Sequence, residues 1–351
     1  MPFVRFQNVC LEGFGCTLPD EIVSSADIEA QLSPLYERLR LPPGRLELMT
    51  GIRERRFWPA GTLPGEMSVR SAEQAIQNCG IDRKQIGALV HGSVCRDHLE
   101  PATACSVHHR LGLSNNCAIY DVSNACLGLL NGMVQVANMI ELGQIHAGLV
   151  VGSEGGRQLV ETTIAALNAD QTLTRSTVKN AVASLTIGSA SAAVLLTHRS
   201  LSRTGHRLLG GVMHSNTAYH KLCHSGADEA VASGMQPLMQ TDSEQLMQQG
   251  VAAGAEAFQQ FLAGMEWSVN DIQRTFCHQV GVAHRKLTQE SLGLNPAVDF
   301  STVEWLGNTG AAALPVTMAL GIEENPPQTG DKIAMLGIGS GINVLMLGVE
   351  W

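Results

Sequence analysis

The sequence has few charged and few aromatic residues, and it lacks any long apolar run. Charged residues make up 16% of the 351 positions and aromatic residues 4%, and acidic side chains outnumber basic ones by 32 to 23. A duplex-binding protein usually has a basic stripe, but the densest basic run here is the short, interrupted Arg53–Arg56. We therefore expect no nucleic-acid partner. We also expect no membrane span, because a bilayer requires roughly 18 consecutive apolar residues.

The cysteines and histidines form no recognisable framework. The nine cysteines include no Cys-X-X-Cys pair, and the first residues show no basic region followed by an apolar one, as a signal peptide would. These absences favour a reduced, cytoplasmic protein. His220 and His224 have a helical spacing that a metal could use, but no further ligand is placed by pattern, and we expect no metal.

Short apolar runs alternate with helix-length segments, which is typical of α/β layering. In the first part we expect strands at 88–92, 118–122, 147–152 and 191–196, and helices at 68–77 and 127–142. In the second part we expect helices at 241–261, 280–292 and 311–320, a strand at 274–277, and a hairpin of 332–336 with 344–349. The segment 197–239 shows no clear period, so we place the junction of two α/β halves there, near residue 197.

Cys126 stands where an apolar strand gives way to an apolar segment. We expect a helix to begin at this residue, and a cysteine at a helix start faces unpaired N–H groups and the positive end of the helix dipole. Both effects favour the thiolate and lower the pKa of the thiol. Position alone leaves two interpretations open, because Cys126 could equally be a packed core residue.

Two further polar residues stand at turns before apolar segments. His278 follows the expected strand at 274–277, and Asn308 lies in a glycine-flanked turn before the expected helix at 311–320. Each has a structural alternative: a lone histidine in apolar surroundings is often a satisfied core residue, and an asparagine before a helix is often its N-cap.

Taken together, these residues resemble one family. The order Cys126, His278, Asn308, with the runs Asn124–Gly128, Cys277–Gln279 and Gly307–Pro315, is similar to the thiolase superfamily and to its β-ketoacyl-ACP synthase III branch. Thr50–Arg56 resembles an early segment of that branch, and Gly337–Gly341 resembles its C-terminal glycine-rich turn. The resemblance covers essentially the whole chain.

The resemblance implies a thiolase fold with two similar α/β halves in a five-layer αβαβα arrangement. Residues 1–197 would form the half that holds Cys126, and residues 198–351 the half that holds His278 and Asn308. Cys126 would accept an acyl group from a thioester, and His278 and Asn308 would stabilise the enolate of the second substrate. Backbone N–H groups of Cys126 and Ser340 would form the oxyanion hole.

A glutamate in the run 91–104 points to one type of enzyme within the branch. Glu100 lies 26 residues before Cys126, and its surroundings resemble those in the head-to-head acyl-CoA condensing enzymes of the OleA type. The resemblance implies that Glu100 reaches into the active site of a partner subunit in a homodimer and removes an α-proton. Without the resemblance, Glu100 would be a solvated loop carboxylate. Removing the weakly acidic α-proton of a simple thioester requires a base held at that carbon.

The resemblance therefore implies an acyltransferase that joins two long-chain fatty acyl-CoAs, without a cofactor, into a 2-alkyl-3-ketoacid for olefin or ketone synthesis. A reductase and a β-lactone synthetase would act on its product. The alternative is a malonyl-dependent β-ketoacyl-ACP synthase III of fatty acid or polyketide synthesis. Arg45 and Met49 stand where that enzyme commonly has a Trp and an Arg against the adenine of coenzyme A, so the residues that contact coenzyme A stay open.

Two other classes of protein fit parts of the pattern. A papain-like cysteine hydrolase also uses Cys, His and Asn in this order, but it predicts a different sequence around the nucleophile. A non-catalytic thiolase-like subunit would have no reason to keep Cys126, His278 and Asn308 together.

Overall fold

The computed structural model describes residues 3–226 and 238–351. Its strands form two similar sets. The first runs β6 (Ala118–Val122), β5 (Ile86–Gly92), β7 (Ala147–Glu154), β8 (Ala190–His198) and β2 (Val9–Thr17). The second runs β12 (Arg274–Cys277), β13 (Lys332–Gly339), β14 (Asn343–Glu350) and β9 (Arg207–Ser215), with β1 (Phe3–Arg5) on β9. The two sets are joined where Cys10 of β2 pairs with Arg207 of β9.

The strand directions repeat from one set to the other. β5 and β7 are parallel, and β8 and β2 then follow antiparallel. β12 and β13 are likewise parallel, and β14 and β9 follow antiparallel. The two halves expected from the resemblance are therefore confirmed by topology, although no repeat is visible in the sequence. The division at residue 197 stays a prediction, and β1 pairs within the C-terminal set although it lies at the start of the chain.

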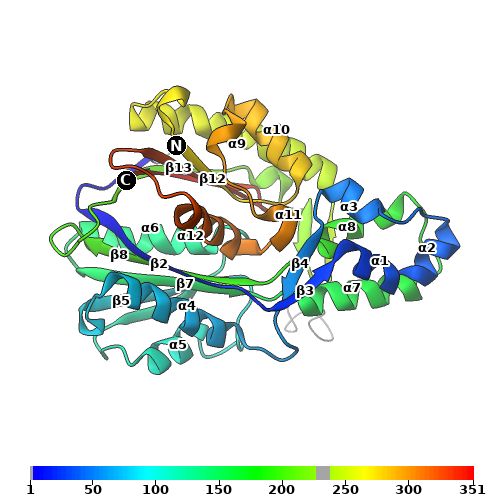
Figure 1. The fold of residues 1–351 in the computed structure, drawn as a ribbon, viewed down its shortest axis with the longest axis horizontal. Helices are drawn as coiled ribbons and strands as arrows, with labels where there is room; N and C mark the ends of the chain where they lie inside the picture. Colours follow the sequence, from blue (N-terminus) through cyan, green and yellow to red (C-terminus); the bar gives the residue numbers. More distant parts are fainter. Residues whose placement is uncertain (1–2, 227–237) are drawn as a thin grey trace.

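Helices and sheets alternate in five layers, seen edge-on in Figure 1. The two sets of strands are the two sheet layers. Between them lie α6 (Gly128–Glu141) and α12 (Ala313–Glu324), which share one core with both layers. The outer faces are covered by α4 (Pro64–Cys79) and α5 (Thr103–Leu111) on one side, and by α9 (Ser243–Met265) and α10 (Val282–Leu292) on the other. The αβαβα arrangement is confirmed. α6 is apolar on nearly every side because it occupies the central layer, where both faces are buried.

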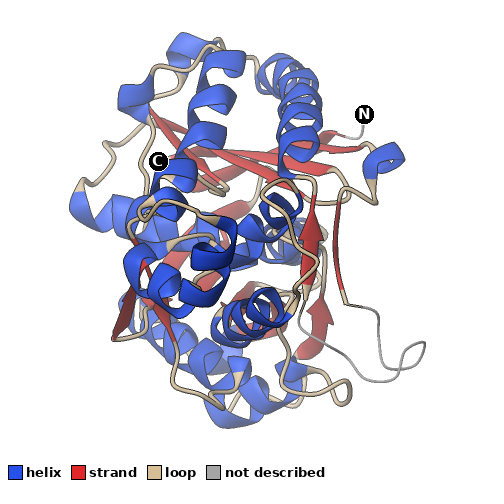
Figure 2. Cartoon of the chain, turned by 90° about the vertical axis from the view of Figure 1, so that its right-hand side faces the viewer, coloured by secondary structure: helices blue, strands red, loops and turns tan. Residues whose placement is uncertain are grey.

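A helical lobe projects beside the layers. It contains α1 (Ser25–Gln31), α2 (Ser33–Leu39), α3 (Arg45–Thr50), α7 (Arg157–Ala169) and α8 (Val182–Leu185), packed around a core of their own. The antiparallel pair of β3 (Glu21–Ser24) and β4 (Glu54–Phe57) connects it to the rest. The lobe lies at the right of Figure 1 and faces the viewer in Figure 2.

The segment 197–239 differs from the expectation of an irregular junction, because it contains β9. This strand escaped prediction since its centre is Gly210-Gly211, which has low strand propensity. Gly210 has a φ of 136°, and a Cβ there would lie 2.0 Å from the carbonyl oxygen of Val4, so the glycine lets β1 approach. The segment also holds β10 (Cys223–Ser225), which pairs with β11 (Met239–Thr241), while residues 227–237 of it lie outside the described residues.

The other expected elements are present, with ends that differ by a few residues. Among the described residues, no helix has the length and apolar character that crossing a membrane requires.

Candidate active site

Cys126 lies in a tight turn between β6 and α6. Ala125, just before it, has a φ of 45°, a left-handed conformation that costs a non-glycine residue roughly 1 kcal/mol. The turn is closed by the N–H of Leu127, which donates to the carbonyl of Asn124 at 2.9 Å. Strained backbone of this kind is often found at functional positions, and here it sets the direction of the half-buried Cys126 side chain.

The expected helix start at Cys126 is wrong by two residues, since α6 begins at Gly128. The expected lowering of the thiol pKa is also wrong. Burial, and to a lesser extent the Glu154 carboxylate, raise the pKa of Cys126 to about 12. The N–H groups of Cys126 and Ser340 lower it, but by less than burial and Glu154 raise it. The resting side chain is therefore a neutral thiol.

Ser340 follows β13 and lies against the Cys126 turn. A Cβ built on Gly339 would be 3.6 Å from the backbone nitrogen of Cys126, so the two segments are in direct contact. The backbone N–H of Ser340 lowers the pKa of the Cys126 thiol, as does the N–H of Cys126 itself. The two N–H groups expected to form an oxyanion hole thus lie at the same sulfur, and their catalytic role stays a prediction.

His278 comes directly after β12, at the edge where β13 also ends. Its N–H donates to the carbonyl of Leu336 at 2.9 Å, and its ring is buried, with no hydrogen-bond partner for Nδ1 among the described residues. Burial and the nearby His284 lower the pKa of His278 to about 3. Because β12 and β13 are parallel, His278 and Ser340 leave their strands at the same edge. His278 is therefore a neutral imidazole on the side of the sheet where Cys126 lies.

Gln279 connects His278 to the segment that leads to Asn308. Its Nε2 donates to Phe300, and its Oε1 accepts the N–H groups of Thr302 and Val303, each at 2.9 Å. The side chain is almost fully buried. Sequence reasoning treated Gln279 only as part of a pattern, and its role in holding two loops together is visible only from these contacts.

Asn308 is fixed through its backbone and its amide oxygen. Its N–H donates to Thr186, and its carbonyl accepts from Gly188, both at 2.9 Å. Its Oδ1 accepts the N–H of Gly310 at 3.0 Å, but the N-cap alternative considered from the sequence is wrong, because the N-cap of α12 is Ala312. The same bond orients the amide so that Nδ2, a hydrogen-bond donor, is the group left to meet a substrate oxygen.

Glu154 is a buried residue that sequence reasoning missed. It ends β7, and its Oε1 accepts the N–H groups of Val94 at 3.0 Å and Ala311 at 3.2 Å, while its Oε2 accepts that of Cys95 at 3.2 Å. Burial raises the pKa of this carboxyl group, and these N–H groups act in the opposite direction. The available signal was an acidic residue closing an otherwise apolar strand, where side chains often face a site.

Glu100 lies away from the buried residues. It is exposed on the single chain, in the loop between β5 and α5, whereas Cys126 is half-buried and His278 and Asn308 are buried. Two apolar neighbours on the same loop, Val94 and Leu99, are also exposed. The loop thus presents Glu100 outward, and its action on a partner subunit stays a prediction.

The remaining candidate positions have structural partners or stand at the surface. The rings of His220 and His224 face the carbonyls of Thr217 and Lys221. Within residues 3–226 and 238–351, no group of three or more His, Cys, Asp or Glu side chains could hold a metal ion. Arg45 and Met49 lie on α3, half-buried and exposed respectively.

Comparison with known families agrees with this geometry. Residues 49–190 match the thiolase N-terminal domain. Residues 262–351 match the C-terminal part of 3-oxoacyl-[acyl-carrier-protein] synthase III. The Cys126 turn lies in the first match, and His278, Asn308 and Ser340 lie in the second. These matches define a condensing enzyme of the thiolase superfamily.

Individual relatives identify a more specific family within the thiolase superfamily. The chain is 41% identical to an acyl-CoA:acyl-CoA alkyltransferase of Shewanella oneidensis, over 99% of this chain and 100% of that protein. It is 33% identical to the protein of the same name from Xanthomonas campestris, over 99% of each. A crystal structure of X. campestris OleA with lauric acid and lauroyl-CoA bound superposes with a TM-score of 0.92 at 32% identity, covering 99% of this chain and 100% of that one. This chain belongs to the OleA-like family of acyl-CoA:acyl-CoA alkyltransferases within the thiolase superfamily. The papain-like alternative is therefore wrong.

Proposed function

We propose that this acyltransferase joins two long-chain fatty acyl-CoAs head to head in a non-decarboxylative Claisen condensation. The observation that carries the proposal is the Cys126 sulfur placed against the N–H groups of Cys126 and Ser340, with Asn308 and His278 on adjoining turns. The two alkyltransferases described above share the whole length of the chain. The substrates are coenzyme A thioesters, and the reaction consumes no other cofactor.

The first step transfers an acyl group to the nucleophile. The Cys126 thiol gives its proton to a neutral base, and its sulfur attacks the thioester carbonyl. The carbonyl oxygen then carries negative charge next to the two N–H groups, which stabilise it. Collapse of this intermediate expels coenzyme A and leaves an acyl thioester on Cys126. We assign this base to His278, whose ring burial and His284 keep neutral, and the proton then passes to the departing coenzyme A thiolate.

The second step forms the carbon–carbon bond. Glu100 of the partner subunit removes an α-proton from a second acyl-CoA, and the enolate oxygen accepts hydrogen bonds from His278 and from Nδ2 of Asn308. The α-carbon attacks the acyl-Cys126 carbonyl, and the cysteine leaves to give a 2-alkyl-3-ketoacyl-CoA. Hydrolysis of that thioester by water yields the 2-alkyl-3-ketoacid and coenzyme A.

A homodimer supplies the base in this account. Two features of the chain support it: β6 is an edge strand with β5 as its one partner among the described strands, and exposed Val94 and Leu99 accompany Glu100. An unpaired edge and apolar residues beside it are features that a second copy would cover. In crystallised variants of X. campestris OleA, the replaced glutamate and the replaced cysteine are 26 residues apart, the same separation as Glu100 and Cys126.

The product fits a short route to olefins or ketones. A 2-alkyl-3-ketoacid loses carbon dioxide to give a symmetric ketone. Reduction of its keto group gives a β-hydroxyacid, which a β-lactone synthetase can close. We therefore propose a reductase and a β-lactone synthetase as the enzymes that act on the product.

The test is to incubate the purified protein with myristoyl-CoA alone and to analyse the products by mass spectrometry. We expect the 2-alkyl-3-ketoacid, or the symmetric ketone formed from it. Carbon–carbon coupling that occurs only after a malonyl thioester is added would instead identify a malonyl-dependent synthase. A Cys126→Ala variant controls for uncatalysed hydrolysis of the thioester.

A further inference from the structure

Glu154 connects two loops that serve different steps of the proposed reaction. Its carboxylate accepts the N–H groups of Val94 and Cys95, which begin the loop carrying Glu100. The same carboxylate accepts the N–H of Ala311, in the turn that carries Asn308. Glu154 is 5% exposed, so these bonds form in low dielectric, where hydrogen bonds are stronger than in water.

The far end of the Glu100 loop is held by other carboxylates. Asp121, on the edge strand β6, accepts the N–H groups of Thr103 and Ala104 at 2.7 and 2.9 Å. Asp97 accepts the N–H of Gly65 at 2.7 Å, and its own N–H donates to Thr103 at 3.1 Å. The loop is therefore anchored at its start, near its middle and at its end, and Glu100 is exposed between the last two anchors.

We propose that Glu154 is a positioning residue that fixes the Glu100 loop, and so sets where the base reaches in the partner subunit's active site. This inference rests on the proposed function, because it needs Glu100 to act across a dimer. Glu154 is buried in its own subunit, so in this proposal it does not touch the substrate that Glu100 deprotonates in the partner subunit. It acts by holding the backbone at Val94 and Cys95, six and five residues before the base.

In a dimer, the hydrogen bonds to Glu154 also link the two active sites. The side chain of Glu154 accepts the N–H of Ala311 and packs against Gly310, both in the turn of its own Asn308. It also holds the loop whose base serves the other site. In each subunit, Glu154 therefore orders two parts of the chain. One is the subunit's own turn with Asn308, and the other is the loop whose Glu100 acts in the partner's active site.

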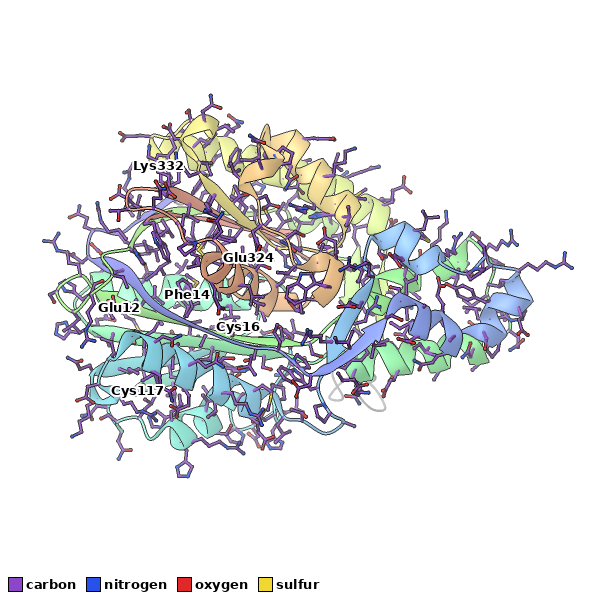
Figure 3. The ribbon with its side chains drawn as sticks, viewed as in Figure 1. Glu12, Phe14, Cys16, Cys117, Glu324 and Lys332 are labelled. Atoms are coloured by element: carbon purple, nitrogen blue, oxygen red, sulfur yellow. The ribbon has the colours of Figure 1, made fainter. Side chains whose placement is uncertain are left out.

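A matched control exists at the other end of the molecule. Glu12, labelled in Figure 3, lies on β2 and is also 5% exposed. Its carboxylate accepts the N–H of Arg203 at 2.8 Å and the hydroxyl of Ser202 at 2.6 Å, so it too anchors a loop. Replacing either glutamate by glutamine exchanges one acceptor oxygen for an NH2 donor that faces backbone N–H groups, but only Glu154 is near the proposed site.

The test uses mixed dimers, purified with a different tag on each chain. One chain carries Glu100→Ala and keeps Cys126, and the other carries Cys126→Ala and keeps Glu100, so only one complete site remains. Glu154→Gln is then added to the chain that supplies Glu100, whose own site is already inactive. In a parallel sample, Glu12→Gln is added to that chain instead. Acylation of the single Cys126 and formation of the ketoacid from myristoyl-CoA are measured separately.

We expect Glu154→Gln to lower ketoacid formation by roughly 100-fold, the cost of a small misplacement of a reacting group, with acylation unchanged. Glu12→Gln should change neither. Unchanged ketoacid formation with Glu154→Gln, or an equal loss of acylation, would overturn the proposal. If the Glu154→Gln chain does not assemble into dimers, Glu154→Asp is tested in the same way. If neither variant assembles, Glu154 is needed for folding or assembly, and the proposal is overturned. An inactive dimer without any change at Glu154 would refute the shared base itself, and the inference with it.

Discussion

Burial of Cys126, together with the charge of the nearby Glu154 carboxylate, raises the pKa of the Cys126 thiol to about 12. The resting side chain of Cys126 is thus a thiol, and in the proposed reaction it becomes a thiolate only as a thioester arrives and a base takes its proton. A neutral thiol is also less prone to oxidation, because oxidation requires thiolate character.

The pH dependence of Cys126 alkylation tests whether the resting side chain is a thiol with a raised pKa. Below the pKa, the thiolate fraction rises about tenfold per pH unit, so the rate of Cys126 alkylation by iodoacetamide should rise with that slope from pH 7 to pH 10. Peptide mapping by mass spectrometry separates Cys126 from the other cysteines. A rate that levels off below pH 9 would show a lowered pKa and contradict the structure.

Buried His278 and half-buried His284 predict loss of stability in acid. In the folded chain the pKa of His278 is lowered to about 3 and that of His284 to about 4, from 6.5. Below pH 6.5 the unfolded chain therefore binds protons that the folded chain does not. The stability contribution is complete above pH 6.5 and is lost as the pH falls toward 4.

Melting temperatures from pH 7.5 to 4 measure this effect. His284→Asn should show a shallower decrease than the unmodified protein, and exposed His109, replaced by Asn, serves as the control. Equal slopes for the unmodified protein and His284→Asn would disprove the assignment.

Glu100→Ala should separate the two steps of the reaction. Because Glu100 is proposed to act only on the second substrate, acyl-Cys126 should form at the normal rate while ketoacid formation falls by roughly 100-fold or more. Both are measured with myristoyl-CoA, and Glu256→Ala, at an exposed glutamate of α9, is the control. Full condensing activity in Glu100→Ala would rule out the base.

Gln279→Ala should affect both stability and condensation. It leaves the buried N–H groups of Thr302 and Val303 without their shared acceptor, which should cost about 2–4 kcal/mol of unfolding free energy. It also frees the segment leading to Asn308, so condensation should fall by more than acylation. Chemical denaturation and the two product assays measure these effects. A loss of stability with an unchanged ratio of the two activities would limit Gln279 to a structural role.

The layered fold could be predicted from the sequence because its buried strands and the central helix are continuous apolar runs. The 127–142 prediction agrees closely with α6, and the 332–336 and 344–349 hairpin with β13 and β14. The helical lobe was not predicted. Its short helices α1, α2 and α3 gain their stability from packing on α7 and α8 rather than from a strong period of their own.

The three polar candidates were found because each stands at a turn in a recognisable local run. The pKa of Cys126 was predicted with the wrong sign, since the sequence shows a nearby helix start but not the depth of burial or Glu154. The contacts of Glu154 and Gln279 were not predictable either. They join segments far apart in the chain, such as Cys95 with Glu154 and Thr302 with Gln279, and only the folded chain brings these together.

The most direct test of the account is to find where the acyl group is attached. The protein is mixed briefly with myristoyl-CoA, quenched in acid, digested and mapped by mass spectrometry. The account predicts a myristoyl thioester on Cys126, absent in Cys126→Ala and accumulating in Glu100→Ala. A myristoyl group on another cysteine, or ketoacid formation that persists in Cys126→Ala, would contradict it.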